Sequence, residues 1–567
     1  MSFRLGIYDG HNSSAVLFSN GKPVYALQEE RLSRIKNHFD FPVQAIRKVM
    51  EMAGIQPADV GAVCISSKYV AKPKKPHQMV KDFEVRYEKS PKRSLINSIG
   101  QNPYYGAWRK NVRMAERKEL AVSMGFNGRT VQFYDHHLAH AASAYFGLKK
   151  DDSRYLVITA DGSGDGVSSG VWVAENGRMT RVAVSSYIHS IGEIYAVTTH
   201  YLGFVPLEHE YKLMGMAPYA SAKQAAEVCE IYSRYLDMDP QNPMEFKSKV
   251  PEPLSMIGPR LERDLRRCRF DSICAGLQLF SEQLLCKWVK ACIKETGVRR
   301  VLASGGVFMN VKANKRISEI EELDYFEAFP SCGDESLPFG ACYLSAVQDG
   351  EITEPLTNYY FGCDISQDGA FRAVKSDASL KIEEPGDMAA RVAQLLEEGT
   401  VVARAAGPME FGARALGNRS ILGDPINQDL VRVINRMIKK RDFWMPFAPV
   451  VLKEESGKYM VNPKNLPSAY MMQSFDTTDA RLEFMAAVHN ADLTARPQIV
   501  EKGQNAGYEG ILKEFKKRTG RAVLLNTSFN LHGFPIVCTP EDALGVLKES
   551  GLKCLLLGPF IVWKKGE

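Results

Sequence analysis

The stretch YLVITADGSGDGVSSGVWVA, residues 155–174, carries the pattern that decides the fold. Its first part, Tyr155 to Thr159, is rich in β-branched and aromatic residues and predicts a strand. The turn sequence DGSGDG at 161–166 stops this strand, and Val167 to Ala174 predicts its returning partner. Strands that alternate with glycine turns and helices along the chain indicate an α/β protein.

The same transition recurs at two other places. A strand predicted over Phe3 to Tyr8 breaks at Asp9-Gly10, and one over Val298 to Ala303 ends in Ser304-Gly305-Gly306 and enters a helix. Glycine permits positive φ and lets backbone N–H groups approach a phosphate closely. Three such turns fit a nucleotide lying in a cleft, although a single Asp-Gly pair is more often a hairpin turn. No internal sequence repeat is visible.

The length of 567 residues predicts several domains, since a domain usually contains about 100 to 200 residues. Pro, Gly, Asn and Tyr accumulate without an apolar period before residue 367, so we expect domains over 1–352 and 368–567 with a linker over 353–367. An apolar fraction of 45% excludes extended disorder, and no run approaches the roughly 20 apolar residues of a membrane helix. Eleven scattered cysteines without a C-x-x-C pair favour a reducing, cytoplasmic compartment.

The net charge of +6 is concentrated in one segment. Residues 68–118 hold 14 basic and 4 acidic side chains, so the rest of the chain is slightly acidic. The simpler interpretation is a solvated insertion at about 68–128. A collar for an anionic substrate or for RNA is the alternative.

A sharper signal is the sequence DHHLAH at 135–140, where a predicted strand meets a helix. His136 and His140 are four residues apart, so on a helix both imidazoles leave the same face. One helix can thereby offer two nitrogen ligands to a metal, and carboxylates from Asp161 and Asp334 can complete the set. Two nitrogens and two oxygens suit iron(II), manganese or zinc and do not decide among them. The spacing is equally compatible with a structural role.

Several motifs resemble the NodU/CmcH family of O-carbamoyltransferases in order and spacing. They are residues 5–17, HHLAHAASAYF, DGSGDG, EYKLMGMAPYA, ASGGVFMN and PSCGDESLPFGA, and the likeness covers nearly the whole chain. The resemblance implies an N-terminal actin-like ATPase fold of the sugar-kinase and chaperone superfamily, similar to the domain that transfers threonylcarbamoyl to tRNA. It also implies that the ligands of iron(II), or of another divalent transition metal, are His136, His140, Asp161 and Asp334.

The resemblance assigns further residues of the N-terminal domain. Those expected to hold the nucleotide are Asp9, Gly10, Asn12, Ser13, Lys36, Gly162, Gly164, Asp165, Gly305, Gly306 and Asn310. His11 matches a family histidine beside the acceptor and is expected to act as the base. Glu210 and Lys212 are expected to line the acceptor pocket, although the sequence does not identify the acceptor.

In the C-terminal domain, residues 407–420, 439–449, 494–498 and 526–530 resemble a YrdC-like α/β domain. Basic side chains on separate motifs suit two polyanions, ATP and carbamoyl phosphate, because guanidinium pairs bidentately with phosphoryl oxygens. These side chains are Arg414, Arg419, Lys439, Arg441 and Arg496, and Lys439 and Arg496 are expected to take part in catalysis.

Two further features of the C-terminal domain bear on substrate binding. Ser528 and Asn530 alternate after a predicted strand, so they point to one side and, with Asn526, can bind a small carbonyl and amide. The family usually reads G-R-x-E-F-G-P-R, whereas this chain has Pro408 and Ala413 at the second and seventh positions. Pro408 removes a cation and an N–H donor, so a phosphate contact at that position is in doubt.

The reaction implied by the resemblance has two stages. Carbamoyl phosphate and ATP, with Mg²⁺ bridging the phosphates, would form carbamoyl adenylate in the C-terminal domain. The carbamoyl group would then pass, in the metal-containing N-terminal domain, to a hydroxyl of a small natural product. No membrane or nucleic-acid partner is expected, and a homodimer is compatible with the family.

Two alternatives belong to other functional classes. A fused tRNA threonylcarbamoyl-type enzyme would bind RNA through the basic segment, and its affinity for tRNA would fall steeply with salt concentration. A non-catalytic actin-like regulator would bind nucleotide but would need neither the histidine pair nor the second basic pocket. A sugar kinase would leave the last 200 or so residues without a role.

Overall fold

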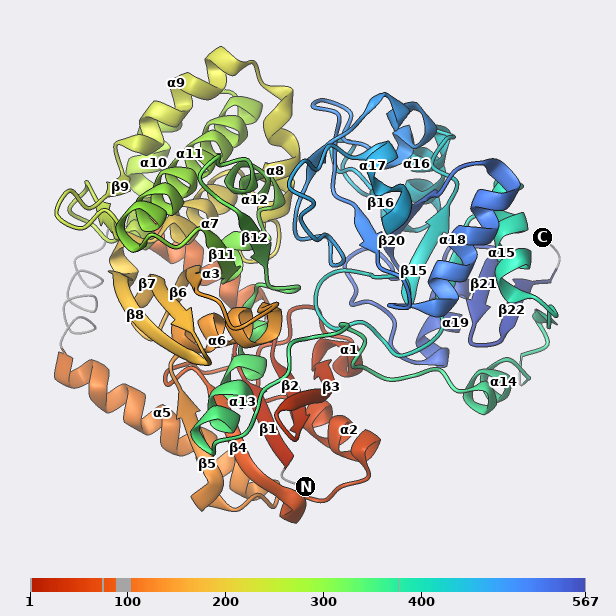
Figure 1. Ribbon diagram of the computed structural model, residues 1–567, viewed down its shortest axis with the longest axis horizontal. Helices are drawn as coiled ribbons and strands as arrows, with labels where there is room; N and C mark the ends of the chain where they lie inside the picture. The colour runs from red at the N-terminus through yellow and green to blue at the C-terminus, as the bar shows by residue number, and fades with distance from the viewer. Residues whose placement is uncertain (1–2, 74–75, 88–102, 376, 566–567) are drawn as a thin grey trace. The chain divides into compact units, whose positions relative to one another are not determined.

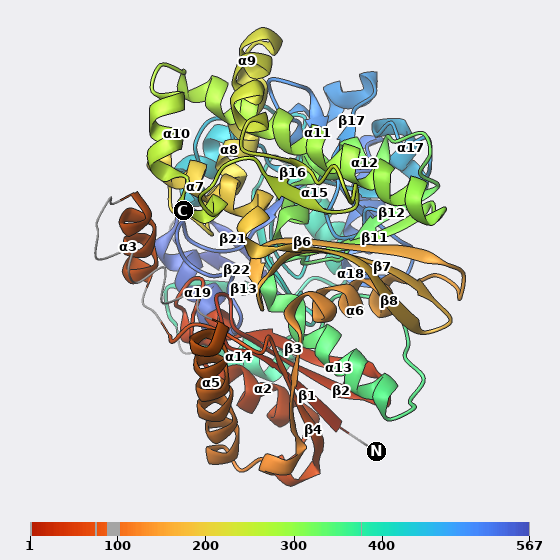
Figure 2. The ribbon, with the colours of Figure 1, turned by 90° about the vertical axis from the view of Figure 1, so that its left-hand side faces the viewer.

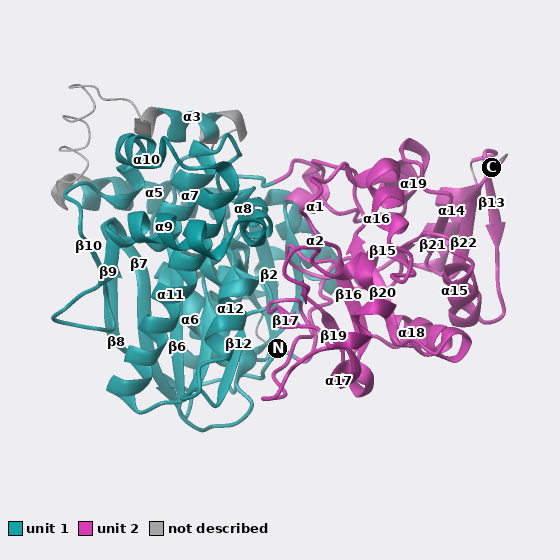
Figure 3. Cartoon of the chain, turned by 90° about the horizontal axis from the view of Figure 1, so that it is seen from above, with its two compact units in different colours: residues 1–29, 37–356 teal, residues 30–36, 357–567 magenta. Residues whose placement is uncertain are grey.

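A computed structural model describes residues 3–73, 76–87, 103–375 and 377–565 (Figure 1). The chain forms two compact units: unit 1 comprises residues 1–29 and 37–356, and unit 2 comprises residues 30–36 and 357–567 (Figure 3). The sequence predicts one boundary at 353–367 and does not anticipate that residues 30–36 belong to the C-terminal unit. Residues 74–75 and 88–102 of the basic segment lie outside the described residues.

Unit 1 contains two five-stranded sheets with the same strand order, β3-β2-β1-β4-β5 and β8-β7-β6-β11-β12. In each sheet the first three strands are antiparallel, and two later strands add parallel to the first one. The strands are β1 (Phe3–Tyr8), β2 (Ser14–Ser19), β3 (Lys22–Gln28), β4 (Val60–Ser66), β5 (Val131–Tyr134), β6 (Tyr155–Gly164), β7 (Val167–Glu175), β8 (Arg178–Ser186), β11 (Arg300–Ser304) and β12 (Tyr325–Ala328). This duplicated topology is that of the actin-like ATPase fold, so the predicted fold is confirmed, and the repeat is structural only.

Two helices lie between the two sheets of unit 1 (Figure 2). Helix α13 (Leu337–Gln348) packs against β1 and β4, whereas α6 (His136–Leu148) packs against β6 and β11, and the helices pack on each other. They approach so closely that a Cβ at Gly340 would lie 1.8 Å from the carbonyl oxygen of Ala139. The unit is therefore layered as sheet, helix, helix, sheet, and its middle brings the start of α6 near the start of α13.

The remaining elements of unit 1 cover the outer faces of the sheets. Helix α2 packs on β2 and β3, and α7 and α11 pack on β6. These elements are α2 (Val43–Ala53), α3 (Pro76–Tyr87), α5 (Pro103–Ser123), α7 (Ile191–Tyr201), α8 (Glu210–Met216), α9 (Ala222–Ser233), β9 (Leu236–Met238), β10 (Phe246–Ser248), α10 (Gly258–Leu265), α11 (Phe270–Thr296) and α12 (Val311–Ser318). Among the described residues, every helix is too short or too polar to cross a bilayer.

Unit 2 is built on an eight-stranded mixed sheet of order β13-β22-β21-β14-β15-β20-β16-β19. Its strands are β13 (Leu380–Glu383), β14 (Val402–Ala405), β15 (Arg419–Gly423), β16 (Ala448–Leu452), β19 (Gln498–Val500), β20 (Val523–Ser528), β21 (Cys554–Leu557) and β22 (Phe560–Lys564), and a separate pair is β17 (Phe475–Asp476) with β18 (Thr494–Ala495). Its helices are α1 (Glu30–Ser33), α14 (Gln367–Lys375), α15 (Met388–Glu397), α16 (Asp429–Ile434), α17 (Ser456–Tyr459), α18 (Ala506–Thr519) and α19 (Pro540–Glu549). Unit 2 is therefore also an α/β unit, as predicted.

Some local predictions are met and others are not. The sequence Thr539-Pro540-Glu541-Asp542 predicts a helix start, and Thr539 caps α19 by accepting from the backbone N–H of Asp542. The turn predicted over 161–166 is wrong, because β6 continues through a bulge to Gly164 and only Asp165-Gly166 forms the turn, with φ of 51° and 89°. An Asp-Gly turn with two positive φ values is a hairpin connection, which is the simpler of the two interpretations.

Candidate active sites

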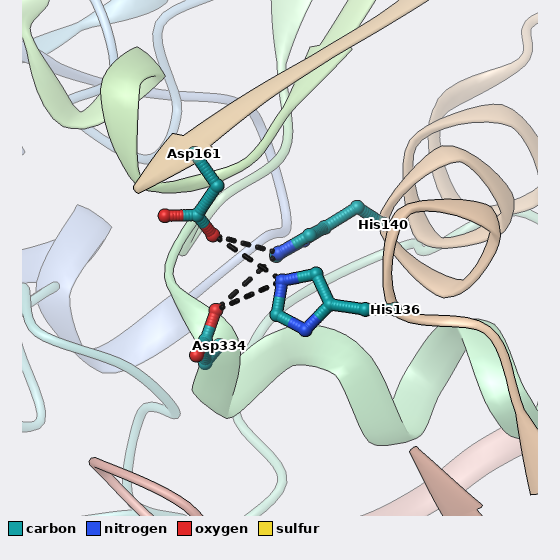
Figure 4. A group of neighbouring side chains, drawn as sticks. All are labelled: His136, His140, Asp161 and Asp334. Carbon is teal, nitrogen blue, oxygen red and sulfur yellow. Dashed lines mark hydrogen bonds and ion pairs between the residues drawn. The ribbon is translucent and has the colours of Figure 1, made fainter. Parts of the chain in front are cut away.

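Four predicted ligands in unit 1 converge on one point (Figure 4). His136 and His140 leave the first turns of α6, Asp161 lies on β6, and Asp334 lies just before α13. The Nε2 atom of His140 is 3.2 Å from Asp161 Oδ2 and 3.4 Å from Asp334 Oδ1, and the Nε2 atom of His136 is 3.5 Å from each of these oxygens. The four ligand atoms lie within 4.8 Å of one another, which is a spacing that one metal ion can span.

A hydroxyl group contacts the outer atom of three of these four side chains. Ser67 Oγ lies 2.7 Å from His136 Nδ1, and Ser304 Oγ lies 3.2 Å from His140 Nδ1. Tyr8 donates to Asp334 Oδ2, and burial followed by the Asp334 charge raises the pKa of Tyr8 well above its usual value. These contacts leave both Nε2 atoms and one oxygen of Asp334 facing the centre. Outer partners of this kind orient metal ligands.

The electrostatics of the cluster favour opposite charges in close contact. Although burial disfavours an imidazolium, the carboxylates of Asp334 and Asp161 raise the pKa of His136 to about 9. Although burial also disfavours a carboxylate, the neighbouring imidazoles of His136 and His140 hold the pKa of Asp161 well below its usual range. His136 Nε2 is buried without a hydrogen-bond partner. Such an orphaned nitrogen beside two carboxylates fits a divalent cation, which would replace the proton.

Two neighbours explain why the sequence around the ligands is restricted. His137 points away from the cluster, because its ring lies 2.8 Å from Thr159 Oγ1 and 3.0 Å from the Val167 carbonyl oxygen. A Cβ at Gly164 would lie 2.1 Å from the His136 ring. Gly164, predicted to contact a nucleotide, is therefore needed to make room for the His136 ring.

Several residues predicted to hold the nucleotide have other partners. The carboxylate of Asp9 pairs with the buried Arg117 at 2.6 and 2.9 Å, and that of Asp165 accepts three backbone N–H groups. Asn310 caps α12 and exchanges hydrogen bonds with Gln278. Both the N–H and the hydroxyl of Ser13 donate to the His38 carbonyl. The side chains of these four residues therefore hold backbone or other side chains.

Other predicted residues of unit 1 keep groups that can face a ligand. Asn12 adopts a left-handed φ of 63° between Gly10 and Ser13, and His11 forms an isolated bridge with Phe39. Gly162 donates its N–H to Asp161 Oδ1, and a Cβ at Gly306 would lie 3.1 Å from that oxygen. Gly305 has φ of 102°, which few other residues adopt. These glycines place backbone directly beside Asp161.

The two residues assigned to the acceptor lie at the start of α8. Glu210 Oε1 accepts from the Leu207 N–H at 2.6 Å, and burial raises the pKa of Glu210 to about 7. The Lys212 ammonium lies 5.2 Å above the ring of Phe204. A carboxyl with a pKa near 7 can exchange a proton at physiological pH, which is a property of many catalytic acids and bases.

In unit 2, strand register brings the predicted cations to one edge of the sheet. The start of β16 faces the end of β20 (Ala448 opposite Asn526), and the start of β15 faces the same end (Ser420 opposite Ser528). Strand β19 is parallel to β16, so it also starts at this edge. The edge therefore receives the residues that precede β15, β16 and β19 and those that follow β20, namely Arg414, Lys439, Arg441, Arg496 and Asn530.

Lys439 ends a π-helical turn, Asn435–Lys439, and turns inward. Its Nζ donates to Ser528 Oγ at 3.0 Å and to Asn530 Oδ1 at 2.8 Å, and Arg441 donates to Thr527 Oγ1 at 3.0 Å. Burial and the charges of Arg441 and Lys36 lower the pKa of Lys439 well below its usual value. π-Helical turns often occur at functional sites, and this one delivers a buried ammonium to the strand end.

Arg496 is the second strongly perturbed cation of unit 2. Burial and the neighbouring charges of Arg414 and Arg441 lower its pKa well below its usual value. Arginine stays protonated in proteins, so the lowered pKa expresses the unfavourable free energy of burying this charge and of holding it beside like charges. Such a cluster, named here the cation site and consisting of Lys36, Arg414, Lys439, Arg441 and Arg496, is suited to a polyanion.

Two residues predicted for this site have structural roles instead. The fully buried Arg419 donates from all three nitrogens to the backbone carbonyls of Cys363, Gly407, Asn418 and Cys538. The prediction that it binds phosphate is wrong, because its donors are already used. Asn526 is buried as well and donates to the carbonyl oxygen of Ala415 and to Gln498.

Residues 30–36 bring Lys36 into unit 2. Arg31 donates to the Gly412 carbonyl at 2.7 Å, and Arg34 donates to the carbonyls of Pro535 and Ile536 at 2.9 and 2.8 Å. Lys36 is predicted to bind the nucleotide intermediate as part of the N-terminal domain, whereas it lies in the C-terminal unit and adds to the charge around Lys439. The sequence offers no signal for this exchange.

The sequence did not single out four residues that shape the two sites. They are Tyr8, Ser67 and Ser304 in unit 1 and Arg404 in unit 2. Arg404 is buried and donates to the Gly417 carbonyl and to Asn418 Oδ1, both at 2.6 Å, so it secures the loop that carries Arg414. Tyr8 and Ser304 lie in recognised motifs, residues 5–17 and ASGGVFMN, whereas Ser67 and Arg404 lie in none.

Comparison with known proteins gives two family models that together match most of the chain. Residues 4–343 match the model described as Carbamoyltransferase N-terminus, and residues 393–564 match Carbamoyltransferase C-terminus. Nodulation protein NolNO of Sinorhizobium fredii is 30% identical and aligns with 98% of this chain and 79% of its own. An uncharacterized protein of Methanocaldococcus jannaschii is 29% identical over 99% of both chains. The solved structure of HypF from T. kodakarensis has a TM-score of 0.33 and 14% identity, and the match covers 62% of this chain and 48% of that one.

Proposed function

The chain belongs to the carbamoyltransferase family, and from this premise we propose that it is an ATP-dependent O-carbamoyltransferase that modifies a hydroxyl of a small molecule. The observation that carries the proposal is that each unit gathers a separate charged site of a different kind. Unit 2 holds cations against cations, which suits ATP and carbamoyl phosphate. Unit 1 holds two imidazoles against two carboxylates, which suits a metal ion beside the transfer step.

In unit 2, carbamoyl phosphate is cleaved by water to carbamate and phosphate. A carbamate oxygen then attacks the α-phosphorus of ATP, the bond to the β-phosphate oxygen breaks, and carbamoyl adenylate and pyrophosphate form. Lys439 and Arg496 bind the phosphoryl oxygens, and the bound negative charge offsets the burial and the cation–cation repulsion that lower their pKa values. Ser528 and Asn530, which contact Lys439, bind the carbamoyl group. Mg²⁺ bound to the phosphates supplies further neutralising charge.

In unit 1, the acceptor hydroxyl attacks the carbamoyl carbon, the bond to the AMP oxygen breaks, and His11 receives the hydroxyl proton. The adenylate phosphate lies against the backbone around Gly162, Gly305 and Gly306, where the absence of side chains permits a close approach. His136, His140, Asp161 and Asp334 would hold a divalent metal, iron(II) or a similar ion, which would supply positive charge to stabilise the leaving AMP. Keeping the intermediate in one chain limits its hydrolysis by water.

The state of the cysteines supports an intracellular setting for the enzyme. All eleven cysteines belong to the described residues, and all are free thiols. Free thiols persist in reducing compartments, so we place the enzyme in the cytoplasm. Its partners are then ATP, carbamoyl phosphate and a small hydroxylated acceptor.

Products distinguish this reaction from other uses of ATP. The protein incubated with carbamoyl phosphate and ATP should release AMP and pyrophosphate, and a panel of hydroxylated metabolites should include one that gains the mass of a carbamoyl group. Formation of ADP alone would refute adenylate formation. Turnover that requires threonine and bicarbonate in place of carbamoyl phosphate would assign the protein to tRNA modification instead.

A further inference from the structure

Ser67 stands at a strained position next to a proposed metal ligand. It follows β4 and has φ of 63°, in the left-handed region that serine rarely adopts. Its hydroxyl lies 2.7 Å from His136 Nδ1, and both residues are buried. With a metal ion on Nε2, which faces Asp161 and Asp334, Nδ1 would carry the ring proton and its N–H would donate to Ser67 Oγ.

Arg117 of α5 holds the turn that contains Ser67. This arginine is fully buried, and its Nη1 and Nη2 atoms donate to the carbonyl oxygens of Ser67 and Ser66 at 2.7 and 2.9 Å. Its charge is balanced by Asp9 at the end of β1, through contacts of 2.6 and 2.9 Å. The guanidinium therefore fixes the two carbonyls that flank the hydroxyl-bearing residue.

Asp165 fixes the other side of the same turn. Its carboxylate accepts from the N–H groups of Lys68 and Tyr69 at 2.8 and 2.9 Å, and from the N–H of His136 at 3.0 Å. One carboxylate thus joins the turn to the first residue of α6. A left-handed non-glycine residue persists only where its surroundings over-determine it, and Arg117 and Asp165 do so here.

We propose that Arg117 is a positioning residue for the metal centre, because it holds Ser67 in the backbone conformation that places its hydroxyl on His136. The inference rests on the metal centre of the proposed function. It also gives part of the basic segment a role: Arg117 is one of its cations, and this cation lies buried behind a ligand. Neither the transfer mechanism nor the motifs assign Arg117 or Ser67.

Cobalt(II) binding to the full-length, metal-depleted protein tests this inference, followed by visible absorption. Ser67→Gly removes the hydroxyl but keeps a residue that adopts positive φ without strain. Arg117→Lys keeps a charge for Asp9 but cannot reach two carbonyls and both carboxylate oxygens. Each variant should weaken cobalt(II) binding about 10- to 100-fold and shift the absorption bands, as the loss of an outer partner does. The double variant should lose no more than the weaker-binding single variant, since both act through one contact.

Arg113→Lys provides the matched control, because Arg113 lies one turn earlier on α5, donates to the Val70 carbonyl and Glu116 and to neither Ser66 nor Ser67, and reaches Asp9 only at 3.9 Å. Its cobalt(II) affinity should stay within about threefold of the native value. If the native protein binds cobalt(II) and both Ser67→Gly and Arg117→Lys bind it with the same affinity, the positioning role of Arg117 is refuted, whereas the proposed metal centre is not. If the native protein binds no cobalt(II), manganese(II), zinc(II) or iron(II), both the proposed metal centre and the positioning role of Arg117 are refuted. Should Arg117→Lys not fold, Ser67→Gly decides.

Discussion

The charged site of unit 1 and the cation site of unit 2 differ in the signs of the charges that each brings together. In unit 1, two imidazoles face two carboxylates, so the pKa of His136 rises and that of Asp161 falls. In unit 2, burial and neighbouring cations act in the same direction, so the pKa values of Lys439 and Arg496 both fall. Opposite charges stabilise each other in the free protein, whereas like charges remain unfavourable until an anion binds.

The difference indicates which site is ready before its ligand arrives. In unit 1, contacts with Ser67, Ser304 and Tyr8 hold three of the four clustered side chains in place. The opposite charges of this cluster already attract each other before any ligand binds. The cation site instead stores repulsion that a polyphosphate releases on binding. Transfer should therefore depend on precise geometry in unit 1, and adenylate formation on net charge in unit 2. The following experiments test that division.

The largest effect is expected from His140→Ala. Loss of a direct ligand should abolish metal binding and lower carbamoyl transfer by about 1,000-fold or more, because bound metals supply several kcal/mol of transition-state stabilisation. Pyrophosphate release from ATP and carbamoyl phosphate should stay within about threefold of the native rate, since it occurs in unit 2. Metal analysis and separate assays of the two half-reactions check this. Equal loss of both half-reactions would end the assignment of one site to each unit.

Arg496→Met should show the converse pattern. Removing one cation that stabilises developing phosphate charge should slow pyrophosphate release by about 100- to 1,000-fold. The variant should still transfer the group from supplied carbamoyl adenylate. Arg432→Met is the matched control in the same unit, since that side chain is 79% exposed and should leave both rates unchanged. Normal adenylate formation by Arg496→Met would show that Arg496 does not act on the phosphates.

The two sites should also respond to pH in opposite directions. His136 has a folded pKa of about 9 against an ordinary value of 6.5, so its stabilisation of the metal-free protein is complete below pH 6.5 and is lost as the pH rises through 9. The loss amounts to about 3 kcal/mol at most. The folded pKa of Lys439 lies below its ordinary 10.5, so its contribution makes the protein more stable as the pH rises.

Denaturant unfolding of His136→Gln and Lys439→Met against the native protein, with a chelator present, isolates these two terms. The His136 difference should shrink between pH 6.5 and 9. Charged Lys439 should make the native protein less stable than Lys439→Met, and this difference should also shrink as the pH rises in the alkaline range. The two differences therefore have opposite signs, although both shrink with rising pH. A His136 difference that does not vary with pH would contradict the ion pairing in unit 1.

The smallest effect concerns stability on anion binding. Pyrophosphate at about 100 times its dissociation constant should stabilise the protein by about 2.7 kcal/mol, because it relieves the repulsion in the cation site. A thermal scan should show a shift of several degrees in the native protein and almost none in Arg496→Met. A similar shift in both proteins would place the anion elsewhere.

Much of the fold was predictable because its signals are local. The strand Phe3–Tyr8 and the cap at Thr539 follow from residues adjacent in the chain, and both are confirmed. The histidine pair is predictable for the same reason, since a spacing of four fixes the side of a helix. The duplication of two sheets left no trace in the sequence, because strand order requires only buried apolar residues and not particular ones.

The roles of individual charges were not predictable. Arg419 and Arg496 have the same side chain and lie in equally distinct motifs, yet Arg419 holds carbonyls whereas Arg496 remains in the cation site. Asp9 and Asp334 both follow strands, yet Asp9 pairs with Arg117 and Asp334 joins the ligand set. For the two aspartates the partner is distant along the chain, since Arg117 is 108 residues from Asp9 and Tyr8 is 326 residues from Asp334.

The sequence by itself determined which residue types were present, which faces of helices and strands they share, and the family to which the chain belongs. Only the tertiary structure decided which charges face a ligand, that Lys36 joins the C-terminal unit, and that Ser67 contacts His136. The physical reason is that local periodicity depends on backbone geometry alone, whereas the state of a charge depends on the groups within a few ångströms once water is removed.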